Sequence, residues 1–304
     1  MFSRWWVNGV QVVALKTDGY LPLALRLDTA NVSLNYGTTK DNIIAVWVDN
    51  GASTGWWYEG SGLTRNARLV VASHVAQFKP FAIASPSTVV AGSMSPHGSN
   101  PVHGLMGSAT VFPSADVSIG KVTGAGTRLL ISFELVDTNG RLVGDTQAAW
   151  TTSAANSSST VSAPPITVHK AELWSVARPY LYILIATLKV YGDSVTVLDS
   201  VNTTVGIRSV EWNPTHGLYL NEQHTKMRGF CNHESFTGVG AAISPRIELF
   251  RLQQMRGLGG NSWRTSHNPP RPALLEMADR LGVMILDENR VLRPHRTVPG
   301  TSQM

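Results

Sequence analysis

The sequence predicts a multidomain protein in which β-sandwich segments precede an α/β segment. Up to about residue 210, short runs of β-branched and aromatic residues alternate with turn signals, a spacing typical of antiparallel sandwiches. After residue 210 the pattern changes to strand, helix, strand, helix and strand, which indicates a β/α barrel or an open parallel sheet. The length of 304 residues leaves room for about two or three domains, each with its own core.

The strands expected in the first part are runs of high β propensity. They cover residues 43–48, 128–135, 166–168, 180–191 and 194–198. Turn signals such as Asp-Thr-Asn-Gly at 137–140 separate them. Two stretches rich in Ser, Gly, Pro and Ala have weak patterning. We expect the first, 84–109, to be a linker or an eroded strand pair, and the second, 151–165, to be a long loop.

The second part contains two helices with clear end signals. Ser244 is a suitable N-cap and Pro245 suits the first helical position, so a helix is expected from there to about residue 258. A second helix is expected at 272–281, where Gly282 can end it. Strands are expected at 226–230, 261–264 and 283–286. Because sites are built at the carboxyl ends of parallel strands, polar residues at these ends are candidates for function.

Charge and composition limit the classes of function. Twenty-five Lys and Arg against twenty Asp and Glu are scattered along the chain, which does not indicate a nucleic-acid surface. The longest apolar run, 181–190, is about half the ~20 residues that a membrane helix needs. We see no signal peptide and expect no membrane segment. The single cysteine, Cys231, excludes an internal disulfide, and we expect it to be a small buried residue.

Three blocks after residue 225 form a specific pattern. They are Arg-Gly-Phe-Cys-Asn-His-Glu at 228–234, Arg-Thr-Ser-His-Asn-Pro-Pro at 264–270 and Leu-Asp-Glu-Asn-Arg at 286–290. In this order they resemble the opening of the catalytic barrel in family 2 glycoside hydrolases. They look closer to the β-galactosidase branch than to the β-glucuronidases or β-mannosidases.

Upstream blocks extend the resemblance over most of the chain. Residues 173–175, 178–182 and 206–208 are similar to the end of the family's immunoglobulin-like domain, and residues 7–9, 19–22, 41–46 and 57–65 to the later part of its jelly-roll domain. The resemblance implies three domains. They are a partial jelly-roll sugar-binding domain at 1–72, an immunoglobulin-like β-sandwich at 73–208, and the first three β/α units of an incomplete TIM barrel at 209–304.

The resemblance also implies a site and a β-galactoside-like carbohydrate substrate. The residues that match the sugar pocket are His233, Arg264 and His267, and those that match its supporting positions are Asn232, Asp287 and Glu288. An arginine and histidines at strand ends can orient carboxylates and bond sugar hydroxyls. Without the resemblance, the block at 264–270 reads as an ordinary strand-to-helix turn.

The residues that would perform the chemistry are not expected in this chain. Family members use two glutamates, at the ends of the fourth and seventh barrel strands, as acid/base and nucleophile, whereas only three strands are expected here. Asn221-Glu222 imitates the acid/base motif, but we expect it in a hairpin turn. We therefore expect a chain truncated at both ends and inactive alone. Whether it is a gene fragment, a mispredicted gene model or a split-enzyme subunit stays open.

Two other functions remain open at this point. One is a non-catalytic carbohydrate-binding or assembly module, and the other is a fragment that regains activity with a complementing chain. The possible protein partner is accordingly such a chain or a second copy in a homo-oligomer. No His-X-X-X-His or Cys-X-X-Cys pair is present, so we expect no metal and no cofactor. The aromatic residues Trp5, Trp6, Trp56, Trp57 and Tyr58 could form a sugar-stacking platform. We expect them in the core instead.

Overall fold

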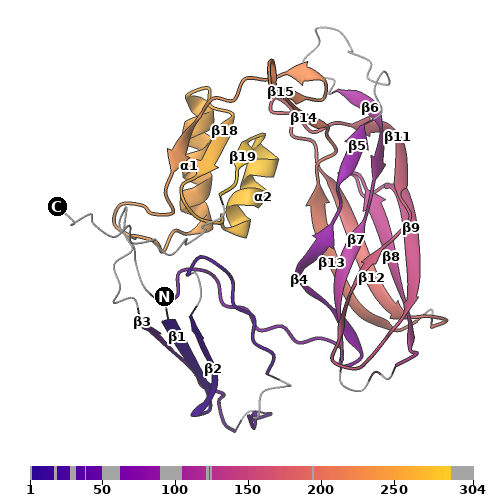
Figure 1. Cartoon of the computed structure of the whole chain (residues 1–304), viewed down its shortest axis with the longest axis vertical. Helices are drawn as coiled ribbons and strands as arrows, with labels where there is room; N and C mark the ends of the chain where they lie inside the picture. The colour runs from indigo at the N-terminus through magenta and orange to yellow at the C-terminus, as the bar shows by residue number, and fades with distance from the viewer. Residues whose placement is uncertain are drawn as a thin grey trace, which may run out of the picture.

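The computed structural model consists of a small sheet, a long β-sandwich and an α/β unit, as Figure 1 shows. It describes residues 2–16, 19–27, 32–37, 39–49, 62–89, 105–120, 123, 125–193 and 195–288. No helix among these residues is both long enough and apolar enough to cross a lipid bilayer.

The first sheet has three antiparallel strands in the order β2-β1-β3. They are β1 (Phe2–Val7), β2 (Val10–Lys16) and β3 (Ile44–Asp49). Asn8 and Gly9 join β1 to β2 with positive φ at both positions, as a tight two-residue hairpin turn requires. Trp5 and Trp6 on β1 are half-buried, while Trp56, Trp57 and Tyr58 lie outside the described residues.

The sandwich is antiparallel, as predicted. Its strands are β4 (Ala76–Ala84), β5 (Ser87–Val89), β6 (Met106–Val111), β7 (Ser114–Ile119), β8 (Arg128–Val136), β9 (Leu142–Thr151), β10 (Ser158–Ser162), β11 (Ile166–Glu172), β12 (Tyr182–Val190) and β13 (Val197–Val205). They pair in the orders β10-β7-β4, β11-β6-β5 and β13-β12-β8-β9. In β8 every second residue, from Leu129 to Leu135, is buried in the core, which is the period of a half-buried strand.

One strand was not predicted, and another begins later than expected. The stretch 151–165, expected to be a long loop, contains β10, because pairing with β7 satisfies its backbone while only Val161 enters the core. The strand expected from residue 194 begins at Val197, because Asp193 Oδ1 accepts the backbone N–H groups of Val195 and Thr196 in a turn. Part of the stretch 84–109 forms β5 and the start of β6, and its centre lies outside the described residues.

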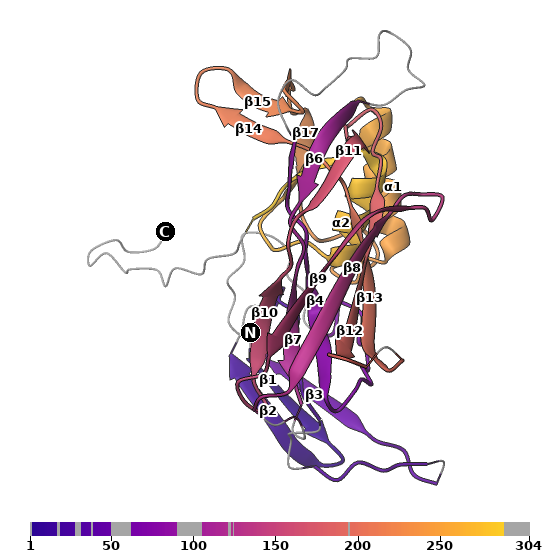
Figure 2. The same ribbon diagram turned by 90° about the vertical axis from the view of Figure 1, so that its right-hand side faces the viewer.

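A small three-stranded antiparallel sheet connects the sandwich to the α/β unit and projects from one end of the molecule in Figure 2. Its strands are β14 (Val210–Asn213), β15 (Gly217–Leu220) and β16 (Gln223–His224). Asn221 and Glu222 have φ of 50° and 61° between β15 and β16, so Glu222 is a turn residue, as predicted.

The α/β unit has a parallel sheet in the order β17-β18-β19. Its elements are β17 (Gly229–Asn232), α1 (Pro245–Gly257), β18 (Ser262–Thr265), α2 (Pro272–Leu281) and β19 (Met284–Leu286). Ser244 caps α1 by accepting the N–H of Ile247 at 3.4 Å, and Gly282 ends α2 in the left-handed conformation. Both helix ends were predicted from these residues.

The strand expected at 226–230 begins instead at Gly229. The side chain of Asn261 accepts from the N–H of Arg228 at 2.7 Å and donates to the carbonyl of Lys226 at 3.0 Å. These bonds replace the sheet bonds that an earlier start of β17 would need. At Gly229 itself an added Cβ would overlap the carbonyl of Ser262 on β18, so only glycine fits there.

The sandwich and the α/β unit are joined by direct contacts. The fully buried indole of Trp174 donates from Nε1 to the carbonyl of Asp279 on α2 at 2.7 Å. Arg256 of α1 donates to the carbonyl of Val176 at 3.2 Å, and Gly282 closely approaches the same Val176 carbonyl. These contacts hold the α/β unit against the sandwich, and α2 lies on the side of the unit that faces it (Figure 1).

Candidate functional site

Glu288 joins the carboxyl ends of β18 and β19. Its Oε1 accepts from Nε and pairs with Nη2 of Arg264, and its Oε2 lies 2.7 Å from Nδ1 of His267. The backbone N–H of Glu288 also donates to Thr265 Oγ1 at 2.9 Å. One carboxylate thus fixes an arginine and a histidine from the neighbouring strand end.

His233, just after β17, lies beside this group. Its ring meets the ring of His267 edge to face, with centroids 5.4 Å apart. Burial, and then the neighbouring His267, lower the pKa of His233 below its ordinary value, because both disfavour the imidazolium form. The structure therefore brings His233, Arg264, His267 and Glu288 together at three adjacent strand ends.

The two remaining candidates differ in their surroundings. Asn232 Nδ2 donates to the carbonyl of Phe230 at 2.9 Å, and its Oδ1 accepts from Arg251 at 3.5 Å. Arg251 also donates to the carbonyl of His233 at 3.1 Å, so Asn232 and His233 share one anchor on α1. Asp287 is exposed and makes no hydrogen bond or ion pair with the rest of the described chain.

Cys231 is exposed, so the expectation of a buried residue was wrong. Cys231 and Arg264 are direct partners in the parallel register of β17 and β18, and Arg264 Nη1 donates to Cys231 Sγ at 3.2 Å. This hydrogen bond, followed by one from Ser266, lowers the pKa of the thiol. The cause of the error is the position: Cys231 lies on the face of the sheet opposite the helices, where its side chain contacts a cation instead of the core.

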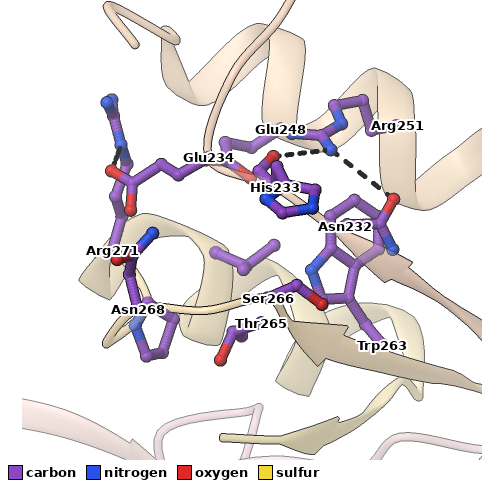
Figure 3. Close-up of a pocket in the computed structure, with 12 residues that line it drawn as sticks. Asn232, His233, Glu234, Glu248, Arg251, Trp263, Thr265, Ser266, Asn268 and Arg271 are labelled. Carbon is purple, nitrogen blue, oxygen red and sulfur yellow. Dashed lines mark hydrogen bonds and ion pairs between the residues drawn. The ribbon is translucent and has the colours of Figure 1, made fainter. Parts of the chain in front are cut away.

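A small cavity lies under the strand ends, against the helices (Figure 3). Its lining includes His233, Glu248, Trp263, Asn268 and Leu274. A volume of about 20 Å³ holds one water molecule and no sugar. Glu248 of α1 is 2% exposed, and its Oε2 has no hydrogen-bond partner among the described residues. Burial raises the pKa of this carboxyl.

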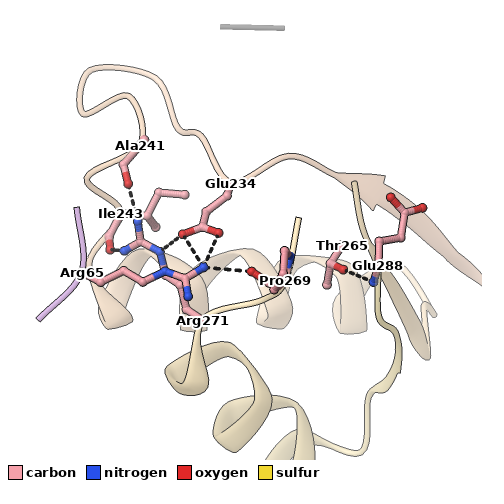
Figure 4. A network of polar contacts seen from close by, with 8 residues as sticks. All are labelled: Arg65, Glu234, Ala241, Ile243, Thr265, Pro269, Arg271 and Glu288. Carbon is pink, nitrogen blue, oxygen red and sulfur yellow. Dashed lines mark hydrogen bonds and ion pairs between the residues drawn. The ribbon is translucent and has the colours of Figure 1, made fainter. Parts of the chain in front are cut away.

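Glu234 forms the centre of a second polar network, shown in Figure 4. Its carboxylate accepts from Nε of Arg271 and, at 3.0 Å, from Nη2 of Arg65. Arg65 also donates to the carbonyl of Pro269 at 2.8 Å. Arg271 also donates from Nη1 to the carbonyl of Ile243 and from Nη2 to the carbonyl of Ala241. The network connects the segment after the first sheet to the two loops that follow β17 and β18.

The sequence did not single out this network. Two features of the sequence could have indicated it. Glu234 directly follows His233 in the block 228–234, and Arg65 is the last residue of the block 57–65. The contact itself joins residues 169 positions apart, which no local pattern predicts. No group of three or more His, Cys, Asp or Glu that could hold a metal ion occurs in the part of the chain that the structure describes.

Two family models match the chain. The model described as glycosyl hydrolases family 2 matches residues 108–208, and the model of the family 2 TIM barrel domain matches residues 214–300. The matched ranges contain most of the sandwich and all the described strands of the parallel sheet.

Relatives of known sequence agree with the family models. The chain is 29% identical over 295 residues to β-galactosidase BoGH2A of Bacteroides ovatus, covering 95% of this chain and 31% of that protein. It is 28% identical to a putative β-glucuronidase of Formosa agariphila, covering 95% of this chain and 24% of that protein. The chain thus spans a third or less of the length of these curated relatives.

Solved structures show the same fold. A glycosyl hydrolase family 2 member from Bacteroides cellulosilyticus is 26% identical, with a TM-score of 0.80 over 95% of this chain and 36% of that one. A β-glycosidase from Bacteroides vulgatus is 28% identical, with a TM-score of 0.74 over 94% of this chain and 32% of that one. The architecture is that of a partial jelly roll, an immunoglobulin-like sandwich and the first strands of a TIM barrel. The chain belongs to glycoside hydrolase family 2.

Proposed function

We propose that this chain is part of a β-galactosidase-type glycoside hydrolase and contributes one side of its sugar pocket. His233, Arg264 and His267 line the pocket in this proposal, with Asn232, Asp287 and Glu288 as supporting residues. The observation that supports it best is the carboxylate of Glu288, which holds Arg264 and His267 at adjoining strand ends. Fixed side chains at the carboxyl ends of barrel strands are the usual basis of substrate binding in this architecture.

A neutral sugar fits these residues better than a uronate. A sugar carboxylate is best recognised by a cation that is not already engaged by a protein carboxylate or held elsewhere in the protein. Arg264 already bonds Glu288 and the Sγ of Cys231, and Arg251 bonds the carbonyl of His233 and stacks 4.8 Å over the ring centre of Trp263. The β-galactosidase relative therefore supplies a better model for the substrate than the β-glucuronidase relatives do.

The three glutamates at and beneath the described strand ends do not provide the two catalytic groups of a retaining glycosidase, which stand about 5–5.5 Å apart and must reach the sugar. Glu288 is paired with Arg264 and His267, Glu234 with Arg65 and Arg271, and Glu248 is buried. We therefore propose that the chain alone does not hydrolyse glycosides. The division into domains at 1–72, 73–208 and 209–304 is part of the same proposal.

Hydrolysis of a chromogenic β-galactoside tests this function. The purified chain is assayed alone and with a second chain that carries the remaining barrel strands of a family 2 enzyme, and the matching β-glucuronide serves as the control substrate. We expect galactoside hydrolysis only from the mixture. Hydrolysis by the chain alone contradicts the assignment of roles, hydrolysis of the glucuronide contradicts the substrate, and an inactive mixture favours a binding or assembly module.

A further inference from the structure

A second cleft lies between the sandwich and α2, away from the strand ends that carry the candidate sugar pocket. It has a volume of about 430 Å³, within the ~300–1,000 Å³ range of small-molecule sites. Its polar lining comes from three separate segments of the chain and consists of Ser85, Ser87, Thr204, Arg208 and Asp279. α2 lies beside the sandwich in Figure 1, held there by the bond from Trp174 to the Asp279 carbonyl.

Arg208 is the cation of this cleft. Its guanidinium lies 4.7 Å from the ring centre of the fully buried Trp174, an arrangement that fixes the guanidinium plane. Its backbone N–H and carbonyl are bonded to Ser87 Oγ at 3.4 and 3.3 Å. Within the described part of the chain, the guanidinium has neither a hydrogen-bond acceptor nor an ion pair.

Asp279 is the anion of the same cleft. Its carboxylate interacts with Arg208 only through space and forms no hydrogen bond or ion pair with another described residue. Burial raises the pKa of the Asp279 carboxyl and lowers the pKa of the Arg208 guanidinium. Both groups have therefore lost part of their hydration without gaining a protein hydrogen bond, which is costly unless a ligand or water supplies one.

The pair of charges selects the class of ligand. The Asp279 carboxylate would repel an anionic ligand, and the Arg208 guanidinium would repel a cationic one. A neutral molecule with adjacent hydroxyls accepts from Arg208 and donates to Asp279 at once, because each hydroxyl is both donor and acceptor. The hydroxyls of Ser85 and Thr204 on the cleft wall offer further bonds of the same kind.

We propose that the cleft between α2 and the sandwich binds an uncharged saccharide unit through Arg208 and Asp279. This site is separate from the candidate pocket at His233, Arg264 and His267. It gives the chain a second point of attachment to a carbohydrate chain and does not depend on hydrolysis.

Nuclear magnetic resonance of the indole N–H groups tests the site. The signal of Trp174, identified by its loss in Trp174→Phe, is followed in the ¹⁵N-labelled chain during titration with lactose and, separately, with sulfate. We expect lactose to shift this signal to saturation, and Arg208→Met to weaken the lactose affinity about tenfold or more, as loss of charge-assisted hydrogen bonds implies. Asp279→Asn, which keeps the side-chain shape, is expected to weaken it as well.

Control variants separate this site from folding defects and from the proposed pocket. Arg128→Met removes another arginine that stacks on an aromatic ring, 3.7 Å from the ring centre of Tyr191, and should leave the lactose response unchanged. Thr204→Trp fills the cleft with Arg208 intact and should abolish the response. Arg264→Met should leave the Trp174 response intact even if the proposed pocket is wrong. No Trp174 shift with lactose, or a shift with sulfate only, overturns the proposal.

Discussion

Replacing Glu234 with glutamine is expected to destabilise the α/β unit strongly. Glu234 and Arg271 have side chains only 11% and 8% exposed, and Arg65 is 21% exposed. In Glu234→Gln the buried carboxylate disappears while both arginines stay. The amide keeps one acceptor oxygen and turns an NH₂ group toward a guanidinium, donor against donor.

The magnitude follows from what each arginine retains. Breaking a buried ion pair by removing one partner costs about 3–5 kcal/mol. Arg271 keeps the carbonyls of Ala241 and Ile243, and Arg65 keeps the carbonyl of Pro269. These bonds place the expected loss of unfolding free energy near the lower end, about 3 kcal/mol.

Urea unfolding followed by helical circular dichroism measures this loss. The helices of the described residues, α1 and α2, both belong to the α/β unit, so the signal reports on the unit that Glu234 holds. Glu211→Gln, an exposed site on β14, is the matched control and should change stability by less than about 0.5 kcal/mol. A loss as small as the control's in Glu234→Gln would refute a structural role for the network.

Three further predictions concern groups with shifted pKa values. The Cys231 thiol should react with iodoacetamide at a lower pH than a free cysteine, because the hydrogen bond from Arg264 stabilises the thiolate. Arg264→Gln should raise the midpoint of the pH profile of this reaction. An unchanged midpoint would show that the bond does not form in solution. Burial raises the pKa of Tyr182 to about 12, and its hydroxyl oxygen accepts from the N–H of Glu172 at 2.8 Å. Tyr182→Phe should therefore lower the free energy of unfolding, measured by thermal unfolding, by about 1–3 kcal/mol. The neighbouring Tyr180→Phe is the control and should cost less; equal losses would contradict this. The pKa of His233 in the folded state lies below its unfolded value of about 6.5. Between these two pKa values the unfolded state binds more protons than the folded state. The free energy of unfolding should therefore decrease as pH falls below about 6.5. His233→Gln should flatten this decrease, and a pH profile identical to that of the parent would exclude the effect.

The helix ends were predictable because their causes are local. Ser244 and Gly282 act on the residues next to them. The turn at Asn221 and Glu222 was expected from the resemblance to the family's hairpin, and it joins β15 directly to β16. β10 was missed because its Ser and Thr residues carry little apolar pattern and its stability comes from pairing with β7, about 44 residues away.

The site was only partly accessible from the sequence. The order of the three blocks indicated which strand ends meet, whereas the network of Glu234 and the exposure of Cys231 depend on packing between distant segments. The roles of His233, Arg264 and His267 as pocket residues stay predictions, as do the domain boundaries at 72 and 208.

Titration of the histidine signals with methyl β-D-galactoside tests whether these strand ends bind a sugar. The ¹³C-histidine signals of His233 and His267 are assigned by substitution of each with glutamine, and the exposed His169 and His216 serve as internal controls. We expect the signals of His233 and His267 to shift together until the change saturates, and Arg264→Met to weaken this response. Shifts confined to His169 and His216, or an unchanged response in Arg264→Met, would contradict the assignment of these strand ends to a sugar pocket.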